Sequence, residues 1–278
     1  MKKLFTIKSI KRVTIVGLSL ALLFSVAGCQ KKAEDKSIKV GVSAGPYGDM
    51  FTEAIAPSLE EKGYKVEIVE FSDYVQPNIA LGNKEIDVNM FQHSVYLENF
   101  AKEHKLDLTA IKEIPTAGMG IFSNKVTNLE DLPEGATVAI PNDPTNLSRA
   151  IRVLEQTGLV TIDPAVDPTT ATQYTLSENP KKLEFVEVEA PQLPRSLDSS
   201  DIAIINGNFA IGAGLNLSDA LYNEKIGEGY INVIAVRTED KDSQLAKDII
   251  AVVKSDAFKS IIEDENKQYV SFQRPSDY

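Results

Sequence analysis

The stretch that decides the fold is Asp201-Ile202-Ala203-Ile204-Ile205-Asn206 (DIAIIN). Its four central residues are all apolar, which is typical of a parallel strand covered on both faces. Five other short runs resemble it, and helical patterns follow several of them. The runs are SIKVGVSAG (37–45), KVEIVEF (65–71), IDVNMF (86–91), ATVAIPN (136–142) and LEFVEVEA (183–190), and the helical patterns cover 50–63, 74–85, 94–105 and 144–158. The sequence therefore predicts an α/β fold in which a βαβ arrangement occurs twice.

Two further strand-like runs, 116–124 and 229–237, lie between the two halves and after the second half. If the first half needs the last strand and a long helix predicted over 243–266 to complete its sheet, the chain passes between two lobes twice. We predict one lobe from 38–123 plus 232–278 and a second from 124–231, joined by two crossovers that act as a hinge. The alternative is a single doubly wound sheet.

The N-terminus has the layout of a secretory signal. Residues 1–12 carry five basic side chains and no acid, and residues 13–28 carry no charge. Sixteen uncharged residues are fewer than the roughly 20 that a membrane-spanning helix needs. We therefore predict a signal peptide over 1–28, with a signal anchor as the weaker alternative.

Cys29 is the only cysteine of the chain and follows this signal directly. The stretch Leu23–Cys29 resembles the lipobox of bacterial lipoproteins, in which the cysteine takes a diacylglycerol thioether and becomes the new N-terminus. A buried or chance cysteine is the alternative. Because two acyl chains make a stable anchor, we expect a protein held at the extracytoplasmic face of the cell membrane, with residues 29–37 as its lipidated N-terminus and flexible tether.

The charge of the chain excludes one class of partner. Removal of residues 1–28 takes away five positive charges and no negative one, so the formal net charge goes from −11 to −16. Nucleic-acid binding requires a basic surface that displaces counterions. We therefore expect no nucleic-acid partner.

Ligands of open α/β sheets bind beyond the carboxyl ends of the strands. At the end of the run IDVNM, two aromatic residues and a histidine (Phe91, His93 and Tyr96) offer an apolar wall with polar tips. The alternative is that the aromatic residues belong to the core and that His93 caps a helix.

Two more strand ends carry candidate binding residues. Asn142 or Asp143 can cap the helix that follows, and Arg149 can present its guanidinium to a carboxylate. Alternatively, Arg149 pairs with a surface acid, which contributes only about 0 to 1 kcal/mol. Asn206 offers a donor and an acceptor to an amino-acid head group, or else serves as a turn or helix cap.

Four segments together carry a resemblance to a known family. They are FQHSVYL (91–97), VAIPNDPTNLSRA (138–150), LSENPKKLEFVEVEAPQLPRSL (176–197) and IAIINGNFA (202–210). The chain resembles the methionine-binding lipoproteins of the NlpA type, which are the external components of a methionine ABC importer. The resemblance implies a two-lobed, periplasmic-binding-protein-like fold of type II that closes on one amino acid.

The resemblance also implies roles for individual residues. Arg149 would hold the ligand carboxylate, and Asn206 and Asn146 would be polar anchors around the amino-acid head. The wall around the thioether would consist of Tyr74, Phe91, His93 and Tyr96. The sequence departs from the family pattern at Val95, where proline is usual, and at Ala117-Gly118, where Glu-Pro is usual.

Two other function classes compete with this interpretation. An enzyme would need a nucleophile with its base, a metal cluster or a phosphate loop, and none of the corresponding motifs is present. A surface adhesin would fit the lipid anchor equally well. We expect a monomeric receptor without cofactor or metal that delivers L-methionine or a close derivative to an ABC permease and its ATPase. Another small amino acid or a methionine-containing dipeptide is the alternative ligand.

Overall fold

The computed structural model of the protein describes residues 36–278, and Ser37–Tyr278 form one compact unit. The predicted signal peptide over 1–28, the predicted lipidation site Cys29 and most of the predicted tether lie outside the described residues. Among the helices from residue 36 onward, none is long and apolar enough to cross a membrane.

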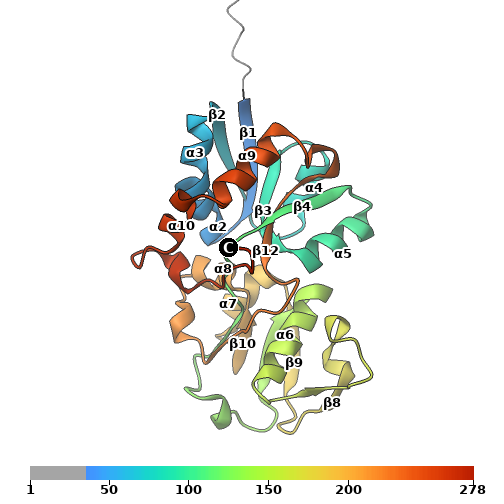
Figure 1. Ribbon diagram of the computed structural model, residues 1–278. Helices are drawn as coiled ribbons and strands as arrows, with labels where there is room; N and C mark the ends of the chain where they lie inside the picture. Colours follow the sequence, from blue (N-terminus) through green and yellow to red (C-terminus); the bar gives the residue numbers. More distant parts are fainter. Residues whose placement is uncertain (1–35) are drawn as a thin grey trace, which may run out of the picture. The chain divides into compact units, whose positions relative to one another are not determined.

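Two five-stranded sheets organise the described chain (Figure 1). The first sheet contains β1 (Lys36–Ser43), β2 (Tyr64–Phe71), β3 (Val88–His93), β4 (Leu108–Glu113) and β12 (Asn232–Arg237). The second contains β5 (Gly120–Phe122), β6 (Thr137–Pro141), β9 (Glu184–Val188), β10 (Ile202–Ile205) and β11 (Tyr222–Asn223). A separate two-stranded sheet pairs β7 (Thr161–Ile162) with β8 (Leu176–Glu178).

The two large sheets repeat one strand order. The first reads β2-β1-β3-β12-β4 and the second, from its other edge, β9-β6-β10-β5-β11. In the first sheet β1 lies between β2 and β3 and runs parallel to β3, and in the second sheet β6 lies between β9 and β10 and runs parallel to β10. An antiparallel strand follows in each sheet, β12 beside β3 and β5 beside β10. The βαβ pattern predicted twice is therefore present twice, as two mixed sheets.

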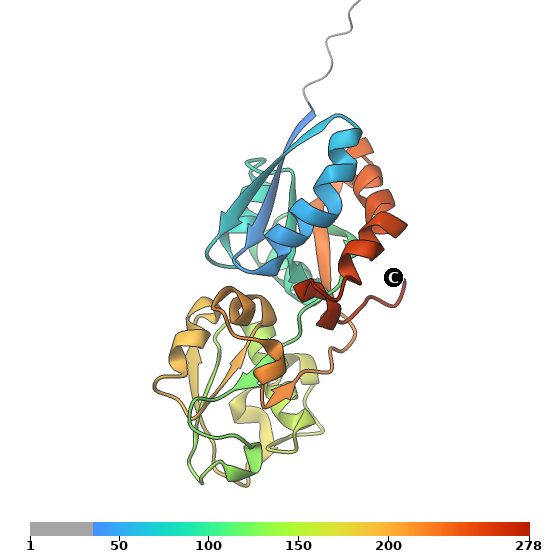
Figure 2. The same ribbon diagram turned by 90° about the vertical axis from the view of Figure 1, so that its left-hand side faces the viewer.

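Helices cover both faces of the first sheet (Figure 2). Side chains alternate along β12: Ile234 and Val236 pack into one apolar cluster, and Val233 and Ala235 pack into another on the opposite face. The first cluster includes α2 (Pro46–Met50), α3 (Ala56–Glu61), α9 (Gln244–Val253) and α10 (Asp256–Ile262), and the second includes α4 (Gln76–Gly82) and α5 (Ser94–His104). A π-helical turn, Phe51–Ile55, joins α2 to α3.

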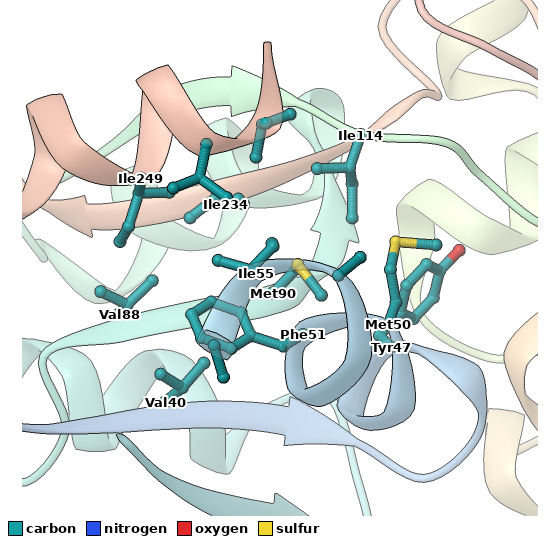
Figure 3. Close-up of a cluster of buried hydrophobic side chains, with 14 of the residues drawn as sticks. Val40, Tyr47, Met50, Phe51, Ile55, Val88, Met90, Ile114, Ile234 and Ile249 are labelled. Atoms are coloured by element: carbon teal, nitrogen blue, oxygen red, sulfur yellow. The ribbon is translucent and has the colours of Figure 1, made fainter. Parts of the chain in front are cut away.

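The core of the first lobe lies between this sheet and the helices of its first face (Figure 3). Phe51 and Ile55 of the π-helical turn meet Val40, Val88 and other strand residues there, all fully or almost fully buried. Burial of one such side chain stabilises the fold by about 1.5 to 3 kcal/mol. The apolar core thus packs helices and strands together that are far apart in the sequence.

The stretch DIAIIN behaves as its composition predicts. Ile202 and Ile204 of β10 pack with α6 (Pro144–Gln156), whereas Ala203 and Ile205 pack with α7 (Leu193–Ser196) and α8 (Gly207–Gly212). All four side chains are buried. The prediction of a strand covered on both faces is confirmed, although β10 is parallel to β6 on one side only and antiparallel to β5 on the other.

The chain passes between the sheets twice. We call the first sheet with its helices the first lobe and the second sheet with its helices the second lobe. Residues 114–119 connect β4 to β5, and residues 224–231 connect β11 to β12. The fold is therefore two-lobed with two crossovers. The predicted boundary at residue 123 stays a prediction, and β5 at residues 120–122 already pairs within the second sheet.

Gln273, near the C-terminus, binds both crossovers. Its backbone exchanges two hydrogen bonds of 2.9 Å with Thr116 of the first crossover. Its side-chain amide accepts from the backbone N–H of Ile226 at 3.1 Å and donates to the Ile226 carbonyl at 3.0 Å, in the second crossover. The C-terminal segment thus holds the two connections together.

The prediction of one long helix over 243–266 is wrong, because the structure has two helices there, α9 and α10. Helix α9 ends at Val253 with Lys254 as its C-cap, and Ser255 caps α10, where its hydroxyl accepts a hydrogen bond of 3.2 Å from the N–H of Phe258. A serine cap competes with helix continuation because its side chain satisfies free N–H groups. Short 3₁₀ turns occupy Leu129–Asp131, Pro168–Thr170, Gln173–Thr175, Ala190–Gln192, Leu217–Asp219, Thr238–Asp240 and Gln268–Ser271.

Candidate functional site

A cavity lies between the two lobes and is lined by residues of both. All seven predicted binding residues line the cavity: Tyr74, Phe91, His93, Tyr96, Asn146, Arg149 and Asn206. The structure thus brings together residues that the sequence separates by up to 132 positions, from Tyr74 to Asn206.

Aromatic side chains of the first lobe form one wall of the cavity, and Phe209 of the second lobe packs against it. The ring of Tyr74 lies 5.7 Å from Phe91, 5.9 Å from Tyr96 and 4.9 Å from Phe209 of α8. Burial raises the pKa of Tyr74 well above its ordinary value, so its hydroxyl stays protonated and can donate. This wall is apolar with hydroxyl groups at its edge.

His93 both caps α5 and reaches across to the second lobe. Its Nδ1 accepts a hydrogen bond of 3.1 Å from the N–H of Tyr96, so the proton of the neutral ring is on Nε2. Nε2 lies 3.4 Å from Oδ1 of Asn146. Burial and the nearby charge of Arg149 lower the pKa of His93 well below its ordinary value. His93 therefore presents a neutral N–H donor to the cavity, and the cap predicted as its alternative role is present as well.

The N-terminus of α6 is built as the sequence indicates. Asp143 is the N-cap, with Pro144 in the first helical position, and its carboxylate accepts from the backbone and side-chain amides of Asn146 at 3.0 and 3.1 Å. These bonds hold Asn146 with Oδ1 directed to His93 and to Asn206, whose Nδ2 donates at 2.8 Å. The cap thus orients a polar side chain at the cavity.

Arg149 has a buried partner, not a surface one. Its Nε and Nη2 donate to Oε1 and Oε2 of Glu224 at 2.8 and 2.7 Å. The two side chains are only 5% and 3% exposed. Burial lowers the pKa of Arg149, but the charge and hydrogen bonds of Glu224 raise it by more. Pairing with an exposed acid is therefore wrong. Within residues 36–278 the structure gives no acceptor for the N–H groups of Nη1, which can therefore donate to a ligand.

The side-chain oxygen of Asn206 is a hydrogen-bond acceptor that has no donor partner in the described chain. The residue precedes α8, but its side chain makes no capping hydrogen bond. Its Nδ2 is engaged by Asn146, and its Oδ1 is buried and has no hydrogen-bond partner in the described chain. Because an unsatisfied buried acceptor costs about 1 to 3 kcal/mol, Oδ1 of Asn206 is suited to a donor group on a ligand.

Six lining residues were not predicted: Tyr47, Gln92, Ala117, Gly207, Asn208 and Asn232. Glu224, which lies behind the wall, was also missed. The sequence holds 40 acidic residues, and nothing local distinguishes Glu224 from the others. Asn208 and Asn232, in contrast, each stand at the edge of an apolar strand run, the signal that singled out Asn206.

The cavity offers hydrogen-bonding and packing groups. Among the described residues, no group of three or more His, Cys, Asp or Glu side chains is placed to hold a metal ion. Arg149 with Nη1, Asn206 with Oδ1 and the aromatic wall together can hold a small molecule with an anionic end, a donor group and an apolar chain.

The chain is similar to known proteins in sequence. The sequence model of the family described as NlpA lipoprotein matches residues 38–272. A D-methionine-binding lipoprotein MetQ of Salmonella typhi is 37% identical over 263 residues, which cover 93% of this chain and 95% of the relative. The MetQ of Escherichia coli K12 is 36% identical over 262 residues, with the same coverage.

Solved structures are similar as well. A nutrient-binding protein of Burkholderia cenocepacia bound to methionine has a TM-score of 0.77 and 37% identity, and the match covers 82% of this chain and 96% of that one. An ABC-transporter periplasmic substrate-binding protein of Coxiella burnetii has a TM-score of 0.79 and 37% identity, with 86% and 100% covered.

Proposed function

The chain belongs to the NlpA lipoprotein family, and from this premise we propose that it captures L-methionine or a close derivative and delivers it to an ABC importer. One observation carries the proposal: the guanidinium of Arg149, the unsatisfied Oδ1 of Asn206 and the aromatic wall all face one cavity. These three features match the carboxylate, the ammonium and the side chain of methionine. We assign capture and release to the protein, and no chemical step.

The head group would be held by the second lobe. Arg149 binds the ligand carboxylate through Nη1, while Glu224 keeps the guanidinium in place. The ammonium of the ligand donates to Oδ1 of Asn206, which supplies the partner that this buried oxygen lacks. Asn146 supports Asn206 through its own Oδ1.

The side chain would be held by aromatic residues. A thioether gains about 0.3 to 1.5 kcal/mol from each contact between sulfur and an aromatic ring. Tyr74, Phe91 and Tyr96 supply such rings within one wall.

Capture would proceed by closure of the lobes. His93 and the aromatic wall belong mainly to the first lobe, whereas Arg149 and Asn206 belong to the second. A ligand makes all these contacts only when the lobes are together, so it shifts the population to the closed form. Release occurs when the permease separates the lobes.

The protein would act from the outer face of the membrane, as a monomer. Lipid on Cys29 would anchor it, with residues 30–35 between the anchor and β1. Cys29→Ser removes the acylated atom, and the protein should then leave the membrane fraction or stay as the precursor. Mature Cys29→Ser protein that remains in the detergent phase would refute the anchor and leave the binding site untouched.

The ligand can be identified directly. Protein purified without added ligand is unfolded in denaturant, and the released small molecules are identified by mass spectrometry. We expect methionine or a close derivative in near-stoichiometric amount. Asn206→Leu should release little, whereas Asn216→Leu, a matched change at an exposed asparagine, should release as much as the wild type. Release of an unrelated compound, with no binding of methionine by stripped protein, would refute the proposal.

A further inference from the structure

Glu224 is a buried carboxylate that joins three parts of the site. Besides the two bonds from Arg149 of α6, its Oε2 accepts a hydrogen bond of 2.8 Å from the backbone N–H of Met119. Met119 ends the first crossover, and Glu224 begins the second. The backbone N–H of Glu224 also donates to the Met119 carbonyl at 2.9 Å. Its position is therefore set by both crossovers.

Glu224 stands directly behind the cavity wall. A Cβ added to Gly118, next to the lining residue Ala117, would lie 3.4 Å from Oε2 of Glu224. Glu224 does not itself line the cavity. Its influence on a ligand thus passes through Arg149 and through its charge.

The charges around the cavity are nearly balanced. Arg149 is the one formally charged side chain among the described residues that line it. Glu224 pairs with Arg149, and the carboxylate of Asp143 lies behind Asn146, bound to its amide groups. A cavity with one paired arginine attracts an isolated anion only weakly, because the nearby carboxylate opposes the carboxylate of the ligand. The same carboxylate favours an ammonium group.

We infer that Glu224 is a positioning and specificity-determining residue that makes the site select a zwitterionic α-amino acid over a monoanionic analogue. This inference rests on the proposed function and deepens it. Glu224 holds the guanidinium so that Nη1 faces the cavity, and its negative charge cancels the positive charge of Arg149. Free α-amino acids are the substrate class, and 2-hydroxy acids and N-acylated amino acids are excluded.

The test compares two ligands of the same length at about pH 7. L-Methionine is a zwitterion, and its 2-hydroxy analogue carries the carboxylate without the ammonium. The affinity for each is measured by calorimetry on stripped wild-type protein, Glu224→Gln, Glu224→Asp and Glu228→Gln. Glu228 is an exposed acid of the same crossover and provides the matched control.

We expect the wild type and Glu228→Gln to prefer methionine by about 100-fold or more. Glu224→Gln removes the charge but keeps the shape, so its preference should fall at least tenfold, mainly through better binding of the 2-hydroxy analogue. Glu224→Asp keeps the charge but shortens the side chain, so both affinities should fall while their ratio is preserved.

An unchanged ratio in Glu224→Gln, or an equal loss for both ligands, would overturn the inference, since a purely structural role moves both affinities together. If Glu224→Gln does not fold, as shown by circular dichroism, Glu224→Asp decides: a ratio that falls while the charge is present overturns the inference. If the wild type binds neither ligand, the proposed function fails and this inference fails with it, whereas an unchanged ratio in a wild type that binds methionine overturns the inference alone.

Discussion

The hydroxyl of Tyr74 in the first lobe donates a hydrogen bond of 2.6 Å to Oδ1 of Asn208 in the second. Nδ2 of Asn208 in turn donates to the carbonyl of Ala44 at 3.1 Å and to the hydroxyl of Ser43 at 3.3 Å. One asparagine at the start of α8 thus binds two segments of the opposite lobe. Tyr74 and Asn208 both line the cavity, so these hydrogen bonds, which we call the latch, hold the two lobes together at the site.

Removal of the Tyr74 hydroxyl tests this latch. Tyr74→Phe keeps the ring of the aromatic wall but leaves Oδ1 of Asn208 without its donor. A hydrogen bond of this kind contributes about 0.5 to 1.5 kcal/mol, so methionine affinity should fall by about two- to tenfold in calorimetry. Tyr222→Phe, which removes a hydroxyl bound to Gln156 away from the cavity, should leave the affinity unchanged. Equal affinities for the two variants would show that the latch does not support closure.

A close backbone approach at Gly45 allows a second test. Gly45 has a φ of 113°, and a Cβ there would lie 2.3 Å from the carbonyl oxygen of Asn208. Gly45→Ala should therefore hold the lobes apart and weaken methionine binding at least tenfold. Gly63→Ala is the matched control, because Gly63 also has a positive φ (86°) but nothing lies within 4 Å of its added Cβ. Both variants should lose about 1 to 2 kcal/mol of stability from backbone strain, but binding should suffer only in the first.

For methionine affinity, the planar guanidinium of Arg149 with its several N–H donors matters more than its positive charge. Arg149→Lys keeps one positive charge but cannot make two parallel bonds to Glu224 while it also binds a ligand carboxylate. Methionine affinity should fall about 10- to 100-fold by calorimetry. Arg152→Lys, one turn farther along α6, should change it less than threefold. Arg149→Ala is a poorer probe, since it leaves Glu224 buried without its counter-charge, which costs about 3 to 5 kcal/mol of stability. Wild-type methionine affinity in Arg149→Lys would refute the role of the Arg149 guanidinium in ligand binding.

The aromatic wall predicts an order of ligands. Norleucine keeps the length of methionine and lacks only the sulfur, so it should bind several-fold to tenfold more weakly. Leucine should follow, and alanine should be far weaker because it forfeits roughly 0.8 kcal/mol for each missing methylene-sized group. Glutamate should hardly bind, since its second carboxylate would be buried without a partner. Thermal-shift titration of stripped protein gives the order directly. Greater stabilisation by glutamate or by a basic amino acid than by methionine would refute it.

The stability of the fold should depend on the protonation of His93. Its pKa is lowered in the folded protein, chiefly by burial and further by Arg149, so the unfolded chain binds the proton more readily. The stabilising contribution is fully present above the unfolded pKa of about 6.5 and is lost as the pH falls below it, with a slope of at most about 1.4 kcal/mol per pH unit. Denaturant unfolding between about pH 5 and 7 measures this slope.

His93→Gln should flatten that dependence, because it removes the side chain whose pKa is lowered by folding. A slope in His93→Gln equal to that of the wild type would show that another group titrates in this range.

Local sequence determined the features that depend on neighbouring residues. The uniform apolar character of Ile202–Ile205 predicted burial on both faces, because each face of that strand meets its own helices. Asp143 and Pro144 predicted the start of α6, because capping involves groups only a few positions apart. Strand ends singled out Phe91, His93, Tyr96, Arg149 and Asn206 as candidates. Tyr74, Asn146 and the assignment of all seven residues to one site came only from the resemblance.

Tertiary structure alone decided the partners of these residues. Arg149 and Glu224 are 75 positions apart, and Tyr74 and Asn208 are 134 apart, so both pairs depend on sheet order and on the two crossovers. The sequence LTAIKE of β4 carries no strong strand signal and becomes a strand because β12 offers it a hydrogen-bonding edge. Of the 40 acidic residues, Glu224 is the one that pairs with Arg149, because folding brings the two side chains together. The sequence alone does not contain that proximity.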